Sequence, residues 1–173
     1  YKMNIAFESN ENIEFADQSM EFISYYAIQA SSNLAKERGT YDSYKGSKWD
    51  RGIFPHDTLN ILEEERGRKI EVDRNTTLDW DKLKSLVKNQ GIRNSNIMAI
   101  APTATISNIS GIYPCTEPAF KNMYMKENLS GNFIVMNKHL IDDLELIGLW
   151  TKDMIKQLKL HDGSLKDIDG IPD

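Results

Sequence analysis

The chain has 173 residues, of which 40% are apolar and 27% are charged, and this balance is typical of a folded globular protein. Lys and Arg number 21 against 26 Asp and Glu, so the net charge of −5 has the wrong sign for a nucleic-acid-binding protein. No apolar run reaches the roughly 18 residues that a membrane-spanning helix needs, and the start of the chain does not read as a signal peptide. We therefore expect a cytoplasmic protein with neither nucleic acid nor membrane as a partner. The abrupt ends, at Tyr1 and Asp173, suggest a piece of a longer chain.

The first predicted element is a long helix that Asn12 caps and Gly39 ends. Lys36 and Arg38 lie in its last turn, where the helix dipole favours cations. Apolar residues recur along it at intervals of three and four in two stripes, one made of Ala16, Met20, Ile23, Ala27, Ala30 and Leu34 and the other of Phe15, Phe22 and Tyr26. Two stripes predict a helix buried on two sides inside a larger body.

Less regular segments follow this helix. Residues 40–57 are rich in Gly, Ser, Asp and aromatic side chains and are predicted to be loops. A short helix is expected over residues 58–62. The almost entirely charged run 63–74 is interpreted as an exposed, solvated loop. Asp79 then caps another helix, which Gly91 ends.

Beyond Asn96 the pattern changes to a short unbroken apolar run, residues 97–101, which is typical of a strand covered on both faces. Two further strands, 124–126 and 133–136, are predicted to form a hairpin. Asn137 and Thr151 each cap a closing helix. The predicted fold class is therefore α/β, mostly helical with a few strands.

The segment after the predicted central strand has the strongest chemical signal. It passes Pro102 and opens a helix with Thr103-Ala104-Thr105-Ile106-Ser107. Backbone N–H groups are free at the positive end of a helix, and small side chains let a phosphate approach the main chain. Without glycine, however, the residues alone favour an ordinary helix cap over a phosphate site.

The stretch from Gly91 to Gly111, which contains this turn, resembles the large (alpha, catalytic) subunit of ribonucleoside-diphosphate reductase. Further matching segments occur in the same order as in that family, namely Ala30–Gly39, Lys48–Asp57, Thr116-Glu117-Pro118, Asn128–Phe133, Gly148-Leu149-Trp150, Asp162-Gly163-Ser164 and Ile171-Pro172-Asp173. The resemblance covers nearly the whole chain. It implies that residues 1–173 belong to the catalytic barrel domain, incomplete at both ends, and that the complete fold is a ten-stranded α/β barrel.

In that family, a thiyl radical removes a hydrogen atom from the ribose of a nucleoside diphosphate, and a turn of this type holds the substrate's phosphates. The resemblance therefore implies phosphate binding, chiefly through main-chain N–H groups, by Thr103, Ala104, Thr105, Ile106 and Ser107. The implied partners are the nucleoside diphosphate, the rest of the large subunit, a second large subunit in a dimer, and a small radical-generating subunit.

The same resemblance implies no catalytic residue, metal site or cofactor site in this segment. The family's radical cysteine and allosteric nucleotide sites match positions before Tyr1, and its radical-delivering tyrosines and C-terminal cysteine tail match positions after Asp173. The family takes its radical from a metal-containing small subunit and its electrons from a thioredoxin- or glutaredoxin-type reductant.

Other reactive side chains in the chain are interpreted as structural. Cys115, the single cysteine, has no second thiol with which to run a dithiol cycle. Glu117 either points toward the ribose or, as we favour, fixes the next turn. Arg93 either orients a phosphate or, as we favour, pairs with an acidic neighbour. Metal-ligand spacing is lacking between the histidines, His56, His139 and His161.

Three functions remain open from the sequence. The first is a part of a reductase catalytic subunit that contributes the phosphate turn. The second is an adenosylcobalamin-dependent reductase, in which glycine more often stands at the position of Ala104. The third is a non-catalytic remnant, or a separately encoded half that acts only with a partner chain. Ala104 and the match over 128–133 favour the diiron or dimanganese type over the second function.

Overall fold

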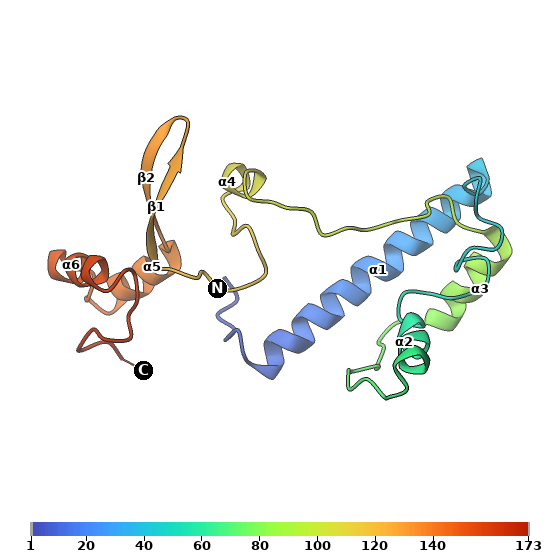
Figure 1. Cartoon of the computed structure of the whole chain (residues 1–173), viewed down its shortest axis with the longest axis horizontal. Coiled ribbons are helices and arrows are strands. Elements are labelled where there is room, and N and C mark those ends of the chain that lie inside the picture. The colour runs from blue at the N-terminus through green and yellow to red at the C-terminus, as the bar shows by residue number, and fades with distance from the viewer. Residues whose placement is uncertain (1, 173) are drawn as a thin grey trace. The chain divides into compact units, whose positions relative to one another are not determined.

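The computed structural model describes residues 2–172, which form two compact units, 10–101 and 2–9 together with 102–172. The elements follow one another as α1 (Asn10–Arg38), α2 (Thr58–Arg66), α3 (Trp80–Gln90), α4 (Ile106–Ser110), β1 (Met123–Asn128), β2 (Gly131–Met136), α5 (Lys138–Leu146) and α6 (Lys152–Leu160) (Figure 1). Within the described residues β1 and β2 form the only sheet, so this segment is mostly helical and is not itself a closed barrel. No helix in residues 2–172 is long and apolar enough to cross a membrane.

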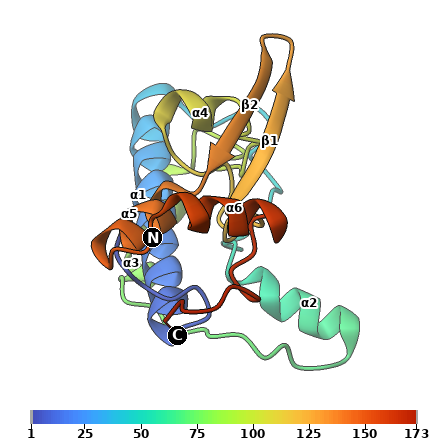
Figure 2. The same ribbon diagram turned by 90° about the vertical axis from the view of Figure 1, so that its left-hand side faces the viewer.

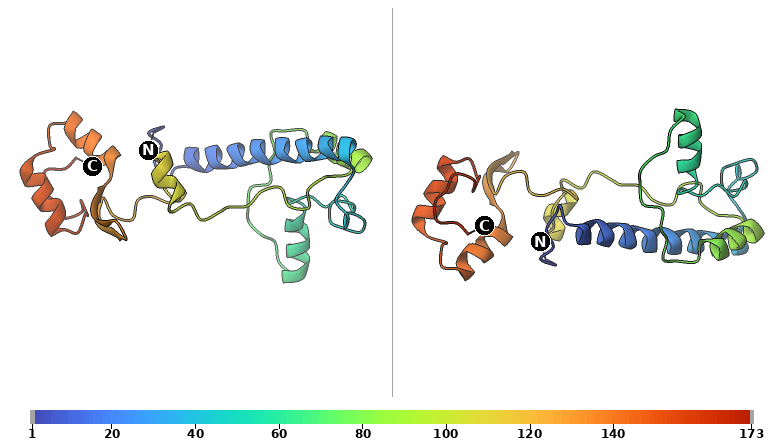
Figure 3. Two further views of the ribbon diagram at one scale, coloured as in Figure 1. Left: turned by 90° about the horizontal axis from the view of Figure 1, so that it is seen from above. Right: turned by 90° about the horizontal axis from the view of Figure 1, so that it is seen from below.

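The core of the first unit lies between α1 and α3, which run side by side (Figures 1 and 3). α1 begins at Asn10, two residues before the predicted cap, and Gly39 ends it as predicted with a φ of 78°. The buried side chains of this core come from both helices and from the loops that follow them, and they are Tyr25, Ile28, Phe54, Leu83, Val87 and Ile92.

The buried face of α1 is not one of the two predicted faces. Both predicted stripes contain exposed side chains, including Met20, Ile23 and Leu34 of the first stripe and Phe15, Phe22 and Tyr26 of the second. At 3.6 residues per turn, the buried face lies roughly a third of a turn away from each stripe. The helix is thus apolar in three directions, and α3 with its flanking loops covers only one of them.

The carboxylate of Glu21 fixes the segment that leads into α3. It accepts hydrogen bonds from the Thr77 and Leu78 N–H groups, at 2.9 and 3.1 Å, and from Trp80 Nε1 at 2.8 Å. Burial alone would raise the pKa of Glu21, but these bonds and one from the Thr77 hydroxyl outweigh it, so the pKa lies below its ordinary value. The same contacts hold the Trp80 ring edge-on to Tyr25, with ring centroids 5.5 Å apart.

A second polar contact of α1 anchors the segment that leaves α3. The buried Ser31 hydroxyl donates to Asn94 Oδ1 at 2.9 Å and accepts from the Asn94 N–H at 3.0 Å. The Ser31 carbonyl also accepts from the Arg93 N–H at 3.1 Å. Trp49 Nε1 donates to the Ser95 carbonyl at 3.0 Å. The chain is therefore held against the first unit up to residue 95.

The buried strand predicted over residues 97–101 is absent from the structure. The segment is irregular, and 98–101 are exposed, with Ile100 96% accessible. A strand is stabilised by ladder hydrogen bonds to a neighbouring strand, and no described strand pairs with this segment. The sequence identifies the apolar run, but the strand predicted from it does not form in the described residues.

The charged run 63–74 is only partly the loop that was predicted. α2 extends through Arg66, and Gly67 ends it with a φ of 63°. Glu63 then accepts a hydrogen bond from the Ile70 N–H at 2.8 Å and pairs with Arg74 at 2.7 Å. The irregular part of the run is therefore tied back to the helix that precedes it.

The second unit is built on the hairpin of β1 and β2, which confirms the predicted hairpin. The antiparallel register runs from Met123 opposite Met136 to Asn128 opposite Gly131. The base of the hairpin packs on α5 and α6, and the strands project away from these helices (Figure 2). Both helices have the predicted caps, because the side chains of Asn137 and Thr151 accept the His139 and Met154 N–H groups at 3.2 Å.

The turn after α6 approaches the start of β1 at Gly163. The Gly163 carbonyl accepts a hydrogen bond from Asn122 Nδ2 at 3.0 Å, and Lys121 pairs with Asp162. A Cβ atom at residue 163 would lie 2.7 Å from Met123 N and 2.9 Å from Met123 O. Gly163 is thus required both for its φ of 82° and for this close backbone contact.

We predict that Glu21→Gln lowers the free energy of unfolding by roughly 1 to 3 kcal/mol, because an amide gives the four donors weaker bonds than a carboxylate. Since the pKa of Glu21 is lower in the folded chain, this stabilisation is present above the unfolded value and is lost as pH falls through the folded one. Urea unfolding of the parent chain and of Glu21→Gln at pH 7 and pH 3 measures this stabilisation. The difference between their free energies of unfolding should be smaller at pH 3. Glu14→Gln, on an exposed site of α1, is the matched control.

We also predict that Gly163→Ala destabilises the second unit more than Gly170→Ala does. Both glycines have a φ of 82°, but a Cβ at residue 170 meets no atom within 4 Å. Gly170→Ala should therefore cost only the left-handed strain of about 1 to 2 kcal/mol, whereas Gly163→Ala adds a backbone clash. Thermal unfolding of the two variants compares them directly, and equal losses would contradict the close contact.

Candidate functional site

The turn at residues 103–107 leads directly into a helix, as the sequence predicts. Residues 104 and 105 form a turn, and α4 starts at Ile106. The Thr103 carbonyl accepts the Ser107 N–H at 2.9 Å, and the Thr105 carbonyl accepts the Asn108 N–H at 3.1 Å. α4 is only one turn long and ends at Gly111, whose φ is 63°.

Three successive backbone donors of this turn are available to a ligand. The N–H groups of Ala104, Thr105 and Ile106 have no hydrogen-bond acceptor within residues 2–172. All three residues are exposed, and the Thr105 hydroxyl likewise has no partner in the described part of the chain. An anion that approaches this backbone meets donors and no carboxylate on the turn itself.

The remaining side chains of the turn hold its shape. The Thr103 hydroxyl donates to the Pro114 carbonyl at 2.6 Å. The Ala104 carbonyl accepts from the Ser107 hydroxyl at 3.3 Å and from Asn108 Nδ2 at 3.1 Å. Ser107 is fully buried, so its hydroxyl and its N–H are both used inside the turn. Sequence reasoning missed Asn108, although an amide four residues after Ala104 was a readable signal.

A cavity of about 740 Å³ lies in the same unit, next to the end of α4, and was not foreseen either. Asn108 and Gly111 line it together with residues of both strands and of α5. Two of its lysines are already paired, Lys121 with Asp162 and Lys138 with Asp142 at 2.6 Å. None of residues 103–107 lines this cavity, so it is separate from the exposed donors of the turn.

Other residues considered from the sequence are placed away from reactive geometry. Arg93 donates to the Thr40 carbonyl at 3.1 Å and has no carboxylate at ion-pair distance in the described chain, so the predicted acidic pairing is wrong. Cys115 is exposed, and its thiol lies 3.5 Å from the carbonyl of Glu117, which is itself exposed. Within residues 2–172, no three His, Cys, Asp or Glu side chains come together in a way that could hold a metal ion.

The comparison with protein families decides what kind of segment this is. The model of the ribonucleotide reductase barrel domain matches residues 1–173, the whole chain. The chain belongs to this family. The resemblance that rested on the motifs of residues 91–111 is thereby confirmed.

Reductase subunits from distant organisms share this segment. The chain is 52% identical over 174 residues to the ribonucleoside-diphosphate reductase subunit alpha of Chlamydia muridarum, covering all of this chain and 17% of the relative. It is 53% identical to the subunit alpha of Chlamydia trachomatis serovar D, with the same coverage. The ribonucleoside-diphosphate reductase large subunit of Arabidopsis thaliana is 36% identical over 99% of this chain and 20% of its own length. The chain thus spans about a fifth of these relatives.

Proposed function

We propose that the chain is part of the catalytic subunit of a ribonucleoside-diphosphate reductase, which converts ribonucleoside diphosphates to deoxyribonucleoside diphosphates by radical chemistry. The observation that carries this proposal is the barrel-domain match along all 173 residues. The printed names of relatives up to 53% identical support the same activity. The reaction's oxidoreductase chemistry belongs to the complete subunit.

The role of this segment in the proposed enzyme is to hold the diphosphate of the substrate. The N–H groups of Ala104, Thr105 and Ile106 supply three donors, and the Thr105 hydroxyl supplies a fourth. Alanine at 104 leaves the backbone open to a phosphate oxygen, where a larger side chain would cover it. Thr103 and Ser107 complete the proposed site by holding the turn in shape through their bonds to Pro114 and Ala104.

The uncovered apolar surfaces of the chain support a place in the ten-stranded barrel. Residues 97–101 are apolar, 98–101 are exposed, and the run lacks a strand partner in the described residues. α1 has two apolar faces that nothing in its own unit covers. In the proposal the run 97–101 becomes a barrel strand, paired by other parts of the large subunit, and α1 packs against the outside of that barrel.

The proposal also assigns the partners of the complete enzyme. A second large subunit forms the dimer, a small metal-containing subunit generates the radical, and a thioredoxin- or glutaredoxin-type protein returns the electrons, all in the cytoplasm. The residues of this chain bind and orient the phosphates only. Hydrogen-atom abstraction and thiol chemistry belong to residues that this segment does not contain, because its one thiol is Cys115.

Substitutions in the full-length subunit test the phosphate turn. Ala104→Leu should obstruct the diphosphate, whereas Thr105→Ala should remove one hydroxyl contact. A hydrogen bond to a charged group is worth roughly 1.5 to 3 kcal/mol, so Thr105→Ala should weaken substrate binding by about 10- to 150-fold at most. The effect should fall on substrate affinity, since the phosphates stay bound while the ribose reacts.

Substrate dissociation constants of the variants show whether the turn binds the diphosphate. Thr105→Ser keeps the hydroxyl and is the matched control, so it should bind substrate nearly as the parent does. Binding of allosteric nucleotides should be unchanged in all three variants. Unchanged substrate affinity in Ala104→Leu would mean that the turn is an ordinary helix cap and that the diphosphate lies elsewhere.

A separate prediction concerns the 173-residue chain on its own. It should reduce no ribonucleotide, because a dithiol cycle needs two thiols and the chain has one. The purified chain, free of other reductase chains, is incubated with each nucleoside diphosphate and a dithiol reductant, and deoxynucleotide is measured by chromatography. Any turnover would refute the proposed division of roles.

A further inference from the structure

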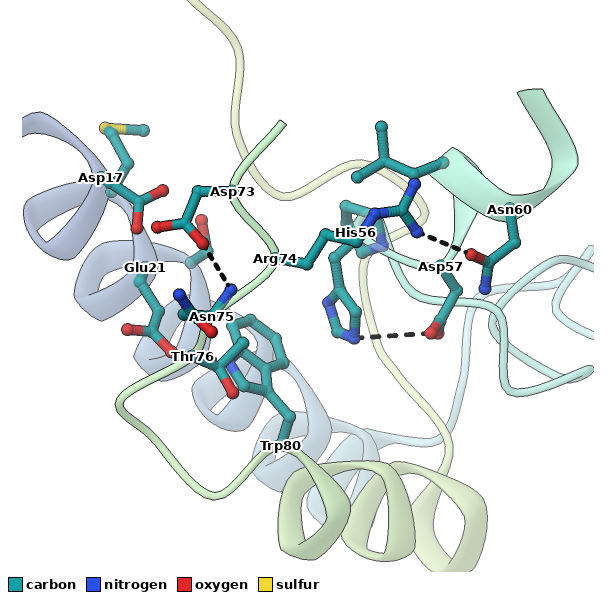
Figure 4. Close-up of a pocket in the computed structure, with 14 residues that line it drawn as sticks. Asp17, Glu21, His56, Asp57, Asn60, Asp73, Arg74, Asn75, Thr76 and Trp80 are labelled. Atoms are coloured by element: carbon teal, nitrogen blue, oxygen red, sulfur yellow. Dashed lines mark hydrogen bonds and ion pairs between the residues drawn. The ribbon is translucent and has the colours of Figure 1, made fainter. Parts of the chain in front are cut away.

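The first unit contains a cavity of about 320 Å³ that plays no part in the proposed phosphate site. Four segments line it, namely α1, residues 55–60 before and within α2, the loop 73–76, and the first residue of α3 (Figure 4). All four belong to the same compact unit, 10–101. The volume is within the range of sites for small molecules.

The charges around this cavity are unbalanced. Four carboxylates line it, those of Asp17, Glu21, Asp57 and Asp73, against the single guanidinium of Arg74. That guanidinium is already paired with Glu63 at 2.7 Å and also donates to Asn60 at 2.9 Å. Asp57 has its own cation, Lys84, at 2.8 Å.

The other three carboxylates have no such partner. Within residues 2–172, no Lys or Arg lies at ion-pair distance from Asp17, Glu21 or Asp73. Glu21 is satisfied by neutral donors, as described above. Figure 4 shows the carboxylates of Asp17 and Asp73 turned toward one another on the α1 side of the cavity. The Asp73 carboxylate also accepts the Asn75 N–H at 2.9 Å. A cation placed between two carboxylates is attracted to both of them.

The rest of the wall is apolar and aromatic. Met20, Leu59 and Pro55 contribute aliphatic surface, and the half-buried Trp80 contributes its indole. The orientation of the indole is fixed, because its N–H donates to Glu21 at 2.8 Å. A rigid indole beside carboxylates is a surface to which an organic cation binds through both charge and the aromatic ring.

From these contacts, the geometry points to a binding site for an organic cation, a guanidinium or primary ammonium group on an aliphatic stem. The charged head lies between Asp17 and Asp73, and the stem lies on Met20, Leu59 and Trp80. A bare metal ion would not use the apolar wall, and the described residues bring no three metal ligands together here. An anion would be repelled by the three carboxylates that have no cationic partner.

A pair of probes of equal shape tests the requirement for charge. n-Butylguanidinium and n-butylurea are each titrated into the 173-residue chain, and the nitrogen-15 NMR signal of the Trp80 indole N–H is followed. The cation should shift this signal in a saturable manner, and the neutral urea should bind at least about fivefold more weakly. The indole signals of Trp49 and Trp150, which do not line the cavity, should stay in place.

Variants of the two carboxylates locate the head group. Each of Asp17→Asn and Asp73→Asn should weaken binding of n-butylguanidinium about two- to fivefold, as expected for charge pairs at exposed residues, and the double variant about tenfold. Asp42→Asn makes the same change on an exposed residue outside the cavity, so it should leave the affinity unchanged. The dispersion of the amide signals shows whether each variant is folded.

Several results would overturn the site. They are equal binding of the neutral urea, equal affinity in the double variant and the parent chain, the same loss in Asp42→Asn, or no shift of the Trp80 signal at any probe concentration. Two sources of the cation are distinguished by repeating the titration with an arginine-containing peptide. Tighter binding of the peptide than of n-butylguanidinium identifies a side chain of another protein, and weaker binding identifies a free small molecule. These outcomes are independent of the phosphate turn.

Discussion

Polar contacts made by one helix determine how the first unit is arranged. α1 presents apolar residues in three directions, so apolar packing alone does not select the face that receives α3. Glu21 and Ser31 make that selection, because each places its hydrogen-bonding groups on the face toward α3. Glu21 gathers the donors of residues 77–80 just before α3, and Ser31 binds residues 93 and 94 just after it. With both ends of α3 fixed, Ile28, Leu83 and Val87 pack as a core.

The same two contacts create surfaces on either side of that core. By holding Trp80 and the loop before it against α1, Glu21 builds one wall of the cavity that contains Asp17 and Asp73. By holding Asn94, Ser31 fixes the chain just before the apolar run 97–101. The helix thus positions both a cavity and an irregular, largely exposed segment. The residues that line the cavity all lie within 10–101, and the segment has no strand partner among the described residues.

What could be predicted from the sequence is what local chemistry determines. Asp79, Asn137 and Thr151 cap helices where they were expected to, since a cap needs only the next three residues. The hairpin was also predictable, because its two strands are joined by a short turn. The start of α4 was predictable for the same reason. In each case the partners of the backbone groups lie within a few residues.

The predictions that failed required distant partners. Periodicity shows which residues of α1 are apolar but not which face is covered, and the covering helix α3 begins more than 40 residues after α1 ends. Apolar composition identified residues 97–101 but does not supply the neighbouring strand that a strand ladder requires. The cation cavity was missed for the same reason, since Asp17 and Asp73 are brought together only by the fold.

The turn that we propose for phosphate binding is shaped by residues within it, and it needs no glycine for that shape. Its shape is local, because Ser107 and Asn108 both bind the Ala104 carbonyl and so direct the chain into α4. The N–H groups of residues 104–106 lie at the start of the helix and have no acceptor in the described residues. A glycine would give the same access with a less rigid backbone. Alanine keeps the access and restricts the backbone, so at the proposed site the donors would be arranged before a phosphate arrives, and less conformational entropy would be lost on binding.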